Sequence, residues 1–552
     1  MKLKNILYSM MMGTAVLTGT TSCVSDLDQY PHTETTSKDV YTSLANYEAV
    51  LGKIYAAMVT SGQGKGGDNK DMESVLNNGS GFDYMRMFIN MQECGTDEFA
   101  STWLTGEQTT GLTYLSWDAN DAWVSDMYYR IYYNIALCNE FLRNANSASF
   151  SGADAEKMKE YKAEVRFMRA LFYYHALDFY RNIPMVTEND PVGSYIPPRY
   201  TPQQTFDYIE SELKDCVGDM LPASTCPYGQ ASQGAAYTLL AKLYLNSEVY
   251  TGVAKYAECK EACEKVMNMG YSLESDYSKL FNADNDKRTN EIIFALPVSA
   301  EHTVSWGSST YLICGQVSMS NANQNVADYG VTAGWSEFRL RPEFVDKFSQ
   351  TDIDGNGDKR CKFFTNGQSK DVTSMTDETT GYLSEKWSNL KDDGTTASNT
   401  ANDGVETDFP LFRLADVYLM YAECVVRTGG DWDNWAGGSD AESDSRKKGA
   451  IYWINKVRER AYGKGKGQVW SSNFANDDAF LQFILDERAR ELYHEGYRRT
   501  DLIRYGQFTT NKYIWQWKGG THDGQAVDSK YNIYPIPNTE LTANPNLHND
   551  NY

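Results

Sequence analysis

Histidine is scarce in this chain, and the motifs of several enzyme classes are missing. Only 6 of the 552 residues are His, and none lies in a pattern that gathers it with a nucleophile. The sequence contains no G-x-S-x-G, no H-E-x-x-H and no phosphate-binding loop. A glycosidase needs two carboxylates about 5–10 Å apart, but such pairs are uninformative among 74 acidic residues. The sequence therefore favours a non-catalytic protein, with a hydrolase as an alternative.

Positive charge and long apolar runs are also in short supply. The formal net charge is −23, which repels phosphate backbones and anionic lipid and argues against nucleic acid as a partner. A neutral ligand would not feel this field. Beyond the N-terminus, no stretch is long and apolar enough to span a bilayer.

The cysteines do not form a recognisable framework. There are 10, at irregular spacings, and a chain of this length does not need disulfides to hold a core. Cys259 and Cys263 lie one helical turn apart, but no second pair and no histidine accompanies them, so core packing is favoured over a metal site. His175 lies in an apolar helical pattern and is interpreted as a packed residue.

The N-terminus predicts export. Two lysines precede an apolar run over residues 6–17, and small residues then lead to Cys23. We interpret residues 1–22 as a signal peptide of the bacterial lipoprotein type, with Cys23 as the acylated first residue of the mature chain. A standard signal peptide with a chance cysteine is the alternative. Residues 23–40 are polar and suit a tether between the lipid and the folded body.

Apolar periodicity predicts helices in several segments. Spacings of three and four residues recur around 157–180 and 231–248, in a helix lined by Tyr256 and Val266, and in the ranges 414–425, 451–461 and 477–495. Consecutive pairs of such helices match the size of tetratricopeptide repeats. None of these pairs can bury its apolar stripe alone, so we expect them to stack.

The expected organisation is a single lobe over residues 41–552, mostly α-helical. Its helical repeat core covers about 120–270 and 409–500. The intervening regions, about 60–120 and 271–408, are rich in Gly, Asn, Ser, Thr and Asp and contain scattered tryptophans. Long loops on a rigid scaffold are where binding sites concentrate, so we expect the site in these two regions.

Four segments resemble one family nearly end to end. They are AEVRFMRALFYYHALDFYRNIPM from Ala163, FPLFRLADVYLMYAECVVRTGG from Phe409, DERARELYHEGYRRTDLIRYGQF from Asp486, and YPIPNTELTANPNLHNDNY from Tyr534. Together with the lipoprotein cysteine, they resemble the RagB/SusD outer-membrane nutrient-binding lipoproteins of Bacteroidetes. This resemblance implies a tetratricopeptide-like helical scaffold with large, irregular, loop-rich insertions.

A narrower similarity points to the starch-binding SusD subgroup. It is carried by TDEFASTWL from Thr96, WGSSTYLICG from Trp306, TAGWS from Thr332 and FTTNKYIWQWKGG from Phe508. By this resemblance, Trp103, Trp306 and Trp335 match aromatic residues that stack on sugar rings, and Arg86 matches an arginine that hydrogen-bonds the sugar. An aromatic ring covers the apolar face of a sugar, while planar polar groups satisfy its hydroxyl rim.

The chain also departs from that subgroup. A second stacking tryptophan is replaced by Ser101, and a ligand-contacting asparagine by Gly106. Core packing is the alternative for any single tryptophan, because most aromatic residues pack inside proteins. Trp387, Trp432 and Trp435 are given no role.

Calcium is the one candidate ion, and no other cofactor is expected. Asp352, Asp354, Asn356 and Asp358 occupy positions 1, 3, 5 and 7 of a calcium-loop pattern, but Phe363 stands where the bidentate acid belongs. A metal-free polar turn is the alternative.

The expected function is capture of an oligosaccharide, an α-glucan in the first instance, at the outer-membrane surface. The resemblance implies delivery to a SusC-type TonB-dependent barrel as partner. Alternatives are capture of peptides or another nutrient, and a tetratricopeptide-type protein-interaction scaffold.

Overall fold

The computed structural model describes residues 37–64, 71–72, 75–76, 82–399, 404–433 and 446–552. The predicted signal peptide and Cys23 lie outside these residues. The chain divides into two compact units, 1–49 and 50–552. In the first unit, helix α2 (Ser37–Val40) occupies the last four residues of the predicted tether, and α3 begins at Leu44.

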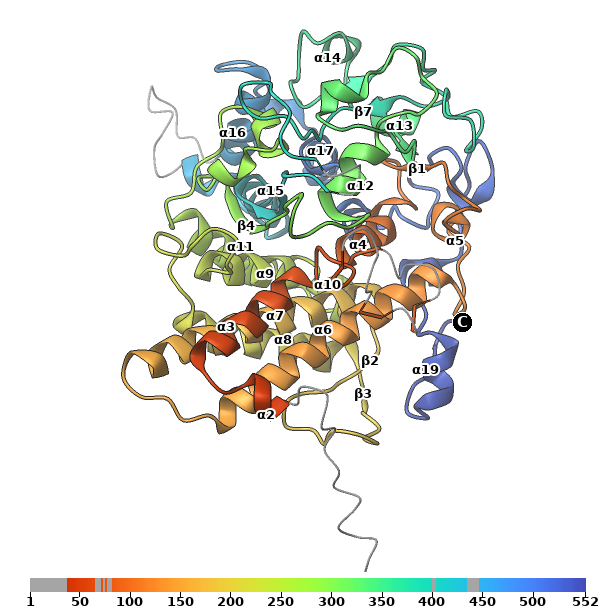
Figure 1. Cartoon of the computed structure of the whole chain (residues 1–552). Helices are drawn as coiled ribbons and strands as arrows, with labels where there is room; N and C mark the ends of the chain where they lie inside the picture. Colours follow the sequence, from red (N-terminus) through yellow and green to blue (C-terminus); the bar gives the residue numbers. More distant parts are fainter. Residues whose placement is uncertain (1–36, 65–70, 73–74, 77–81, 400–403, 434–445) are drawn as a thin grey trace, which may run out of the picture. The chain divides into compact units, whose positions relative to one another are not determined.

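The rest of the chain is dominated by helices (Figure 1). The α-helices are α3 (Leu44–Ala56), α4 (Tyr84–Glu93), α5 (Thr110–Tyr114), α6 (Ala122–Ser147), α7 (Ala153–Tyr180), α8 (Pro202–Cys216), α9 (Gln233–Leu245), α10 (Ser247–Thr251), α11 (Tyr256–Met267), α12 (Ser308–Gly315), α13 (Pro342–Val345), α14 (Gln350–Ile353), α15 (Leu414–Arg427), α16 (Ala450–Tyr462), α17 (Asp477–Leu492), α18 (Arg498–Arg504) and α19 (Asn538–Ala543). Short 3-10 turns are η2 (Val217–Asp219), η3 (Tyr277–Leu280), η4 (Asn285–Lys287), η5 (Val326–Tyr329), η6 (Arg446–Lys448), η7 (Ser471–Asn473), η8 (Lys518–Gly520) and η9 (Ser529–Asn532).

The long helices pack against one another, as expected of helical repeats. Helix α7 packs on α6 and α8, α11 packs on α9 and α15, and α15 packs on α16 and α17. The predicted helices among them bury apolar residues of their stripes, for example Phe172 and Phe179 on α7. The mostly helical, tetratricopeptide-like fold is therefore confirmed.

Local chemistry fixes the helix ends. Asp121 caps α6 by accepting from the backbone N–H groups of Trp123 and Val124. Thr201 and Gln204 form a capping box at the start of α8, with Pro202 as its first residue. Helix α17 ends at Leu492, three residues short of the predicted end. Two residues later, His494 has a left-handed backbone conformation (φ 56°), which a helix cannot contain.

Strands are short, and within the described residues each sheet contains two. The strands are β1 (Ala100–Ser101), β2 (Ile183–Pro184), β3 (Arg199–Tyr200), β4 (Ile292–Leu296), β5 (Phe338–Arg339), β6 (Phe363–Phe364), β7 (Leu383–Ser384) and β8 (Phe409–Arg413). The antiparallel pairs are β1 with β5, β2 with β3, β4 with β8, and β6 with β7. The β1–β5 pair joins the two loop-rich regions, with Ser101 opposite Phe338.

The two regions expected to be irregular contain more regular structure than predicted. The first holds α4, a ten-residue helix in which every residue is buried. Its polar residues Arg86, Asn90 and Glu93 nevertheless recur at four and three, a helical period that the prediction overlooked. The second region holds α12 to α14, the short strands β4 to β7 and the 3-10 turns η3 to η5.

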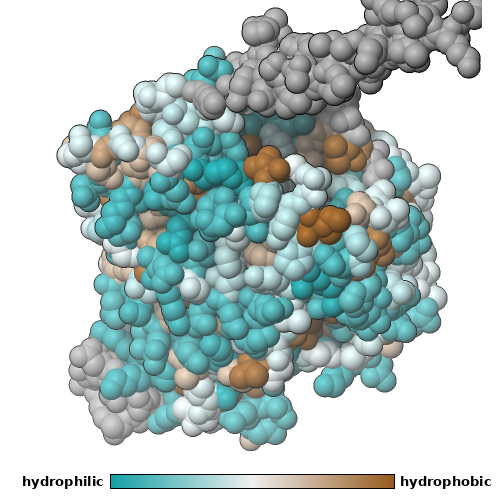
Figure 2. Space-filling model, turned by 90° about the horizontal axis from the view of Figure 1, so that it is seen from below, coloured by the Kyte–Doolittle hydropathy of each residue, from teal (hydrophilic) through white to brown (hydrophobic). Residues whose placement is uncertain are grey.

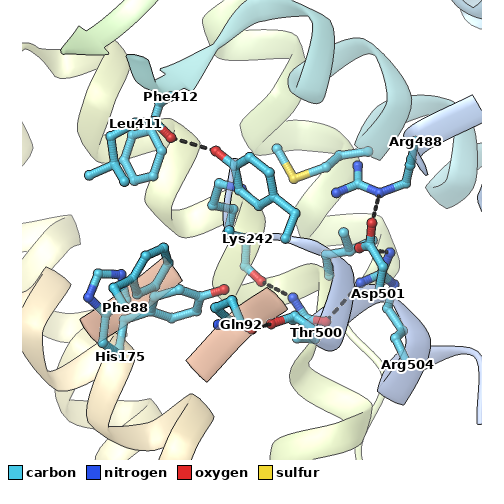
Figure 3. A pocket seen from close by; sticks show the side chains of 16 residues that line it. Phe88, Gln92, His175, Lys242, Leu411, Phe412, Arg488, Thr500, Asp501 and Arg504 are labelled. Atoms are coloured by element: carbon cyan, nitrogen blue, oxygen red, sulfur yellow. Dashed lines mark hydrogen bonds and ion pairs between the residues drawn. The ribbon is translucent and has the colours of Figure 1, made fainter. Parts of the chain in front are cut away.

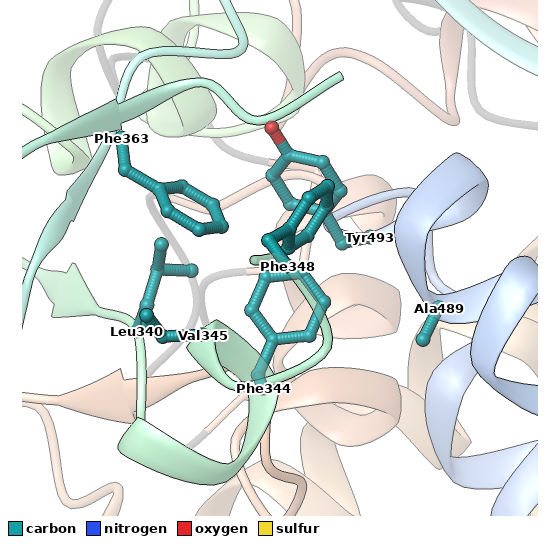
Figure 4. Close-up of a cluster of buried hydrophobic side chains, with 7 residues drawn as sticks. All are labelled: Leu340, Phe344, Val345, Phe348, Phe363, Ala489 and Tyr493. Carbon is teal, nitrogen blue, oxygen red and sulfur yellow. The ribbon is translucent and has the colours of Figure 1, made fainter. Parts of the chain in front are cut away.

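An apolar cluster attaches the second loop-rich region to the helical core (Figure 4). Phe344 and Phe348, from α13 and the residues after it, pack with Phe363 of β6 and with Tyr493, which follows α17. The remaining members of the cluster are Leu340, Val345 and Ala489.

A buried ion network strengthens the same junction. Arg413 of β8 pairs with Glu491 of α17 at 2.6 Å, and Lys386 pairs with Glu495 at 2.6 Å. Arg360 reaches Glu487 at 2.7 Å. Buried pairs of this kind are costly to break one partner at a time, because the other charge is left unpaired.

The surface carries no large apolar patch on the face shown in Figure 2, where hydrophobic residues form small separate spots among polar ones. In the part of the chain that the structure describes, no helix is long and apolar enough to cross a membrane.

Candidate functional site

Trp103 and Trp335, from two distant segments, are in contact, and Arg86 joins the backbone of Trp306 to the same site. The indole N–H of Trp103 donates to the backbone carbonyl of Trp335 at 2.9 Å. Trp103 and Trp306 are 39 % and 38 % exposed, and Trp335 is partly exposed. We call Trp103, Trp306 and Trp335 the tryptophan site. Large aromatic side chains with this much exposure are unusual in a folded protein and mark a candidate binding surface.

Arg86 of α4 connects the three tryptophan segments. Its Nη1 donates to the carbonyl of Trp306 at 2.8 Å. Its Nη2 pairs with Glu107 at 2.5 Å and with Glu337 at 3.1 Å, and these acids follow Trp103 and Trp335 along the chain. One guanidinium therefore holds all three segments, which a planar group with five donors is suited to do.

Arg86 lies behind the tryptophans and not at an exposed rim. Its side chain is 2 % exposed, and the guanidinium carbon lies 4.0 Å from the Phe82 ring centroid and 4.2 Å from that of Tyr311. Cation–π contact on both faces stabilises the buried charge. The Trp335 ring is also near, with its centroid 5.9 Å from the same carbon.

The charges around Arg86 shift one another's proton affinity. Burial raises the pKa of Glu337 to about 8; Arg86 opposes this shift, and the nearby Glu107 adds to it. Burial would lower the pKa of Arg86, but Glu337 and Glu107 outweigh it, and the pKa lies above its ordinary value.

Asp83 organises the backbone that carries Arg86 and Trp306. As the N-cap of α4, it accepts from the Arg86 N–H at 2.8 Å. Its carboxylate also accepts from the Ser305 hydroxyl at 2.7 Å and the Ser308 N–H at 3.2 Å. A Cβ on Gly307 would lie 2.1 Å from an Asp83 oxygen, so only glycine allows this close approach.

The two departures from the starch-binding pattern have structural explanations. Ser101 lies in β1, is 2 % exposed, and its hydroxyl hydrogen-bonds Thr109 at 2.9 Å. In this backbone its side chain therefore belongs to the interior. Gly106 lies against the Trp103 indole, because a Cβ there would be 3.1 Å from Trp103 Cε3.

The acidic residues of the predicted calcium loop bond to neighbouring groups of the protein, and calcium binding there stays a prediction. Asp352 accepts a hydrogen bond from the Asp358 N–H at 2.6 Å, and it forms a capping box with Ser349, the N-cap of α14. Asp358 pairs with Arg360 at 2.5 Å. Among the described residues, no group of three or more His, Cys, Asp or Glu side chains is arranged to hold a metal ion. Asp354 and Asn356 instead form part of a tight exposed turn.

Other residues singled out in the sequence pack in the interior. Cys259, Cys263 and His175 are buried, and burial lowers the pKa of His175 to about 3, so it is neutral beside Tyr84. Trp387 is buried and stacks on Phe409. Trp432 contacts Phe480, and Trp435 lies outside the described residues.

A cavity also lies between helices α4, α7, α9, α15 and α18, but it is too small for a sugar (Figure 3). It has a volume of about 30 Å³ and is bordered by Lys242, Arg488 and Asp501. This space suits about one water molecule. Its charged residues are already paired, for example Arg488 with Asp501 at 2.7 Å.

Sequence reasoning missed Asp83, Glu107 and Glu337. None has a motif of its own, and Glu337 lies 251 positions from the arginine that it contacts. Their role is visible only once the segments are folded together.

Comparisons with known proteins agree with this architecture. Residues 27–245 match a family model described as "Starch-binding associating with outer membrane", and residues 362–552 match one described as "SusD family". The chain is 33 % identical to the starch-binding protein SusD of Bacteroides thetaiotaomicron, over 99 % of both chains. It is 25 % identical to SusD-like protein P25 of Formosa agariphila over 78 % of each chain.

Solved structures show the same fold. A SusD-like carbohydrate-binding protein of Bacteroides fragilis superposes with a TM-score of 0.70 at 18 % identity, covering 92 % of this chain and 100 % of that one. Surface glycan-binding protein A of Bacteroides thetaiotaomicron, in complex with laminarihexaose, superposes with a TM-score of 0.66 at 17 % identity, covering 92 % and 99 %.

A helical-repeat scaffold with two loop-rich insertions and a loop-borne aromatic site defines the SusD-like class of protein. The similarity to one curated relative extends over essentially the whole of both chains. The chain belongs to the SusD/RagB family.

Proposed function

We propose that this protein is a cell-surface lipoprotein that binds oligosaccharides on the tryptophan site, with an α-glucan as the first candidate ligand. The observation that carries the proposal is the meeting of Trp103, Trp306 and Trp335 on one buried arginine, with two of the rings more than one-third exposed. Rigidly held aromatic faces can stack on sugar rings without losing side-chain freedom on binding.

Relatives support a glycan as the ligand class. One is named a starch-binding protein, and a structural neighbour was solved with laminarihexaose. Ser101 and Gly106 remove two expected contacts of the starch-binding pattern, so this site offers fewer contacts at one edge. We therefore expect an α-glucan to bind more weakly here than at a site that keeps both contacts.

The proposed role in uptake requires no bond-breaking chemistry. The acyl chain on Cys23 would keep the binder at the outer membrane, and a SusC-type TonB-dependent barrel would receive the glycan. Tethering raises the effective concentration of the binder at its transporter. Glu107 and Glu337 both pair with Arg86, so these two acids do not face each other across an open cleft as glycosidase carboxylates do.

The test is glycan retention in native gels across starch, levan, xylan, mannan and laminarin, followed by titration calorimetry. Trp103→Ala and Trp335→Ala should each weaken binding about 5- to 160-fold, since stacking of a ring on an aromatic side chain contributes about 1–3 kcal/mol. Trp470→Ala is the matched control, because Trp470 is 40 % exposed but belongs to the segment before η7.

The alternatives predict different outcomes. A hydrolase would release reducing ends with sustained turnover by the pure protein. A peptide-binding protein would retain no glycan but would bind a peptide mixture through the same tryptophans. A protein that acts only as an interaction scaffold would bind its partner barrel in all variants and would have no affinity for glycan.

A further inference from the structure

Glu378 is a carboxylate held in place beside the tryptophan site. Its Oε2 accepts hydrogen bonds from the hydroxyls of Ser320 at 2.6 Å, Ser336 at 2.7 Å and Ser318 at 3.3 Å. Within the described residues, its Oε1 accepts none. Glu378 is partly exposed. Three donors on one oxygen fix the group and leave the other oxygen as an available acceptor.

Ser336 connects this carboxylate to Trp335, the residue before it. The backbone N–H groups of Trp335 and Glu337 donate to the carbonyls of Cys314 and Gly315 at the end of α12, at 2.8 Å each. Between them, Ser336 adopts a left-handed conformation with φ of 51°. This unusual backbone conformation is maintained by the contacts on both sides, so the spacing between Trp335 and Glu378 is fixed.

An exposed methionine lies at the same edge. The Met319 N–H donates to the Ser336 hydroxyl oxygen at 2.7 Å, and the Met319 side chain is 57 % exposed. A flexible, polarisable thioether suits contact with the apolar face of a ligand of variable shape. Trp335, Met319 and Glu378 thus place apolar and acidic groups around a single residue, Ser336.

Two buried arginines near this edge, Arg86 and Arg339, already have partners within the protein. Arg86 is buried between two carboxylates. Arg339 is buried beneath the loop that carries Glu378 and donates to the backbone carbonyls of Ser374, Asp377 and Thr380. Arg339 attracts the Glu378 carboxylate but is held by these carbonyls and cannot reach a ligand. The Glu378 carboxylate can therefore accept hydrogen bonds from hydroxyls and disfavours an anionic ligand.

We propose that Glu378 is a specificity residue of the tryptophan site: its Oε1 accepts a hydroxyl hydrogen bond from a neutral sugar held on Trp335 and disfavours a uronic acid at that position. This inference rests on the proposed glycan-binding function and adds to it the ligand class, neutral glycans over acidic ones.

The experiment uses the full mature chain and four probes: maltoheptaose, laminarihexaose and the C6-oxidised, uronate-containing form of each. Glu378→Gln should weaken binding of the preferred neutral oligosaccharide about tenfold, as expected for loss of a charge-assisted hydrogen bond. The same variant should bind the oxidised form more tightly than the wild-type chain does. The ratio of the two affinities separates these effects from simple loosening of the loop, which would weaken both ligands alike.

Asp377→Asn is the matched control. It removes the same charge from the neighbouring residue, whose carboxylate bonds the backbone and hydroxyl of Thr379 instead. Its affinity ratio should equal that of the wild-type chain. Equal ratios for Glu378→Gln and the wild-type chain would overturn the inference.

The inference and the proposed function fail in distinguishable ways. If the tryptophan variants lose binding while Glu378→Gln changes nothing, the site binds glycan and Glu378 has no part in selecting it. If the wild-type chain binds neither neutral oligosaccharide, or the tryptophan variants bind as well as the wild-type chain, then both proposals are wrong for glucans.

Discussion

At the scale of single residues, Gly106 controls the position of the Trp103 ring. A Cβ added there would lie 3.1 Å from Cε3 of the indole, which is closer than ordinary van der Waals contact. Gly106→Ala should therefore rotate or displace the ring and weaken glycan binding severalfold, while the melting temperature changes little, because the position is exposed. Calorimetric titration together with thermal unfolding checks this. A large fall in melting temperature would instead show that Gly106 has a general structural role.

Glu337 gives the molecule a pH dependence of known sign. Its pKa is raised by burial from the ordinary 4.5 to about 8, so between these values the folded chain holds a proton that the unfolded chain has released. Stability from this group is fully present below pH 4.5 and is lost as the pH rises through 8. The facing groups are Arg86 of α4, Glu107 and Tyr311 of α12.

We expect urea unfolding between pH 6 and pH 9 to show a decline in stability that is smaller in Glu337→Gln, which cannot ionise. Glycan affinity should also fall above pH 8 in the wild-type chain, because ionised Glu337 and Glu107 repel each other beneath the tryptophans. An unchanged slope in the variant would show that other groups cause the decline. His175 contributes to the pH dependence of folding stability with the opposite sign. Because its pKa is lowered to about 3, the stability that it contributes is lost as the pH falls toward 3.

At the scale of elements, the start of α4 couples helix stability to site geometry. Asp83→Ala removes an N-cap, which costs about 1 kcal/mol, and also releases the segment that carries Trp306. We expect both a lower melting temperature and weaker glycan binding. Asp121→Ala, which removes the N-cap of α6, is the control: it should lower the melting temperature comparably and leave glycan affinity closer to the wild-type value.

The elements also show what sequence could and could not predict. Amphipathic helices such as α7 and α15 were predictable because their apolar residues recur at three and four. Helix α4 was overlooked because it lies in a region whose Gly, Asn, Ser and Thr content predicted loops, although Arg86, Asn90 and Glu93 recur at four and three. The tryptophans were found through family resemblance, but Arg86 joins partners 21 and 251 positions away. Such contacts depend on how the β1–β5 pair aligns the loops. That alignment cannot be predicted from the spacing of residues within either segment.

At the scale of the whole molecule, a binder that works on a surface has two separable requirements, a folded site and an anchor. Every described contact of the tryptophan site lies within residues 82–378, far along the chain from Cys23. The two requirements can therefore be tested independently. Cys23→Ser should abolish incorporation of labelled palmitate and move the protein out of the outer-membrane fraction, because the proposed acyl chain would supply the membrane affinity.

The same Cys23→Ser protein should bind glycan in solution with the affinity of the wild-type mature chain, since its site is unaltered. Cells that carry it should nevertheless take up the glycan more slowly, because the effective concentration of binder at the transporter is lost. Trp335→Ala provides the reciprocal case, with normal anchoring and weak binding. If Cys23→Ser stayed in the membrane fraction, the cysteine would not be the anchor, and attachment would have to come from contact with the partner barrel.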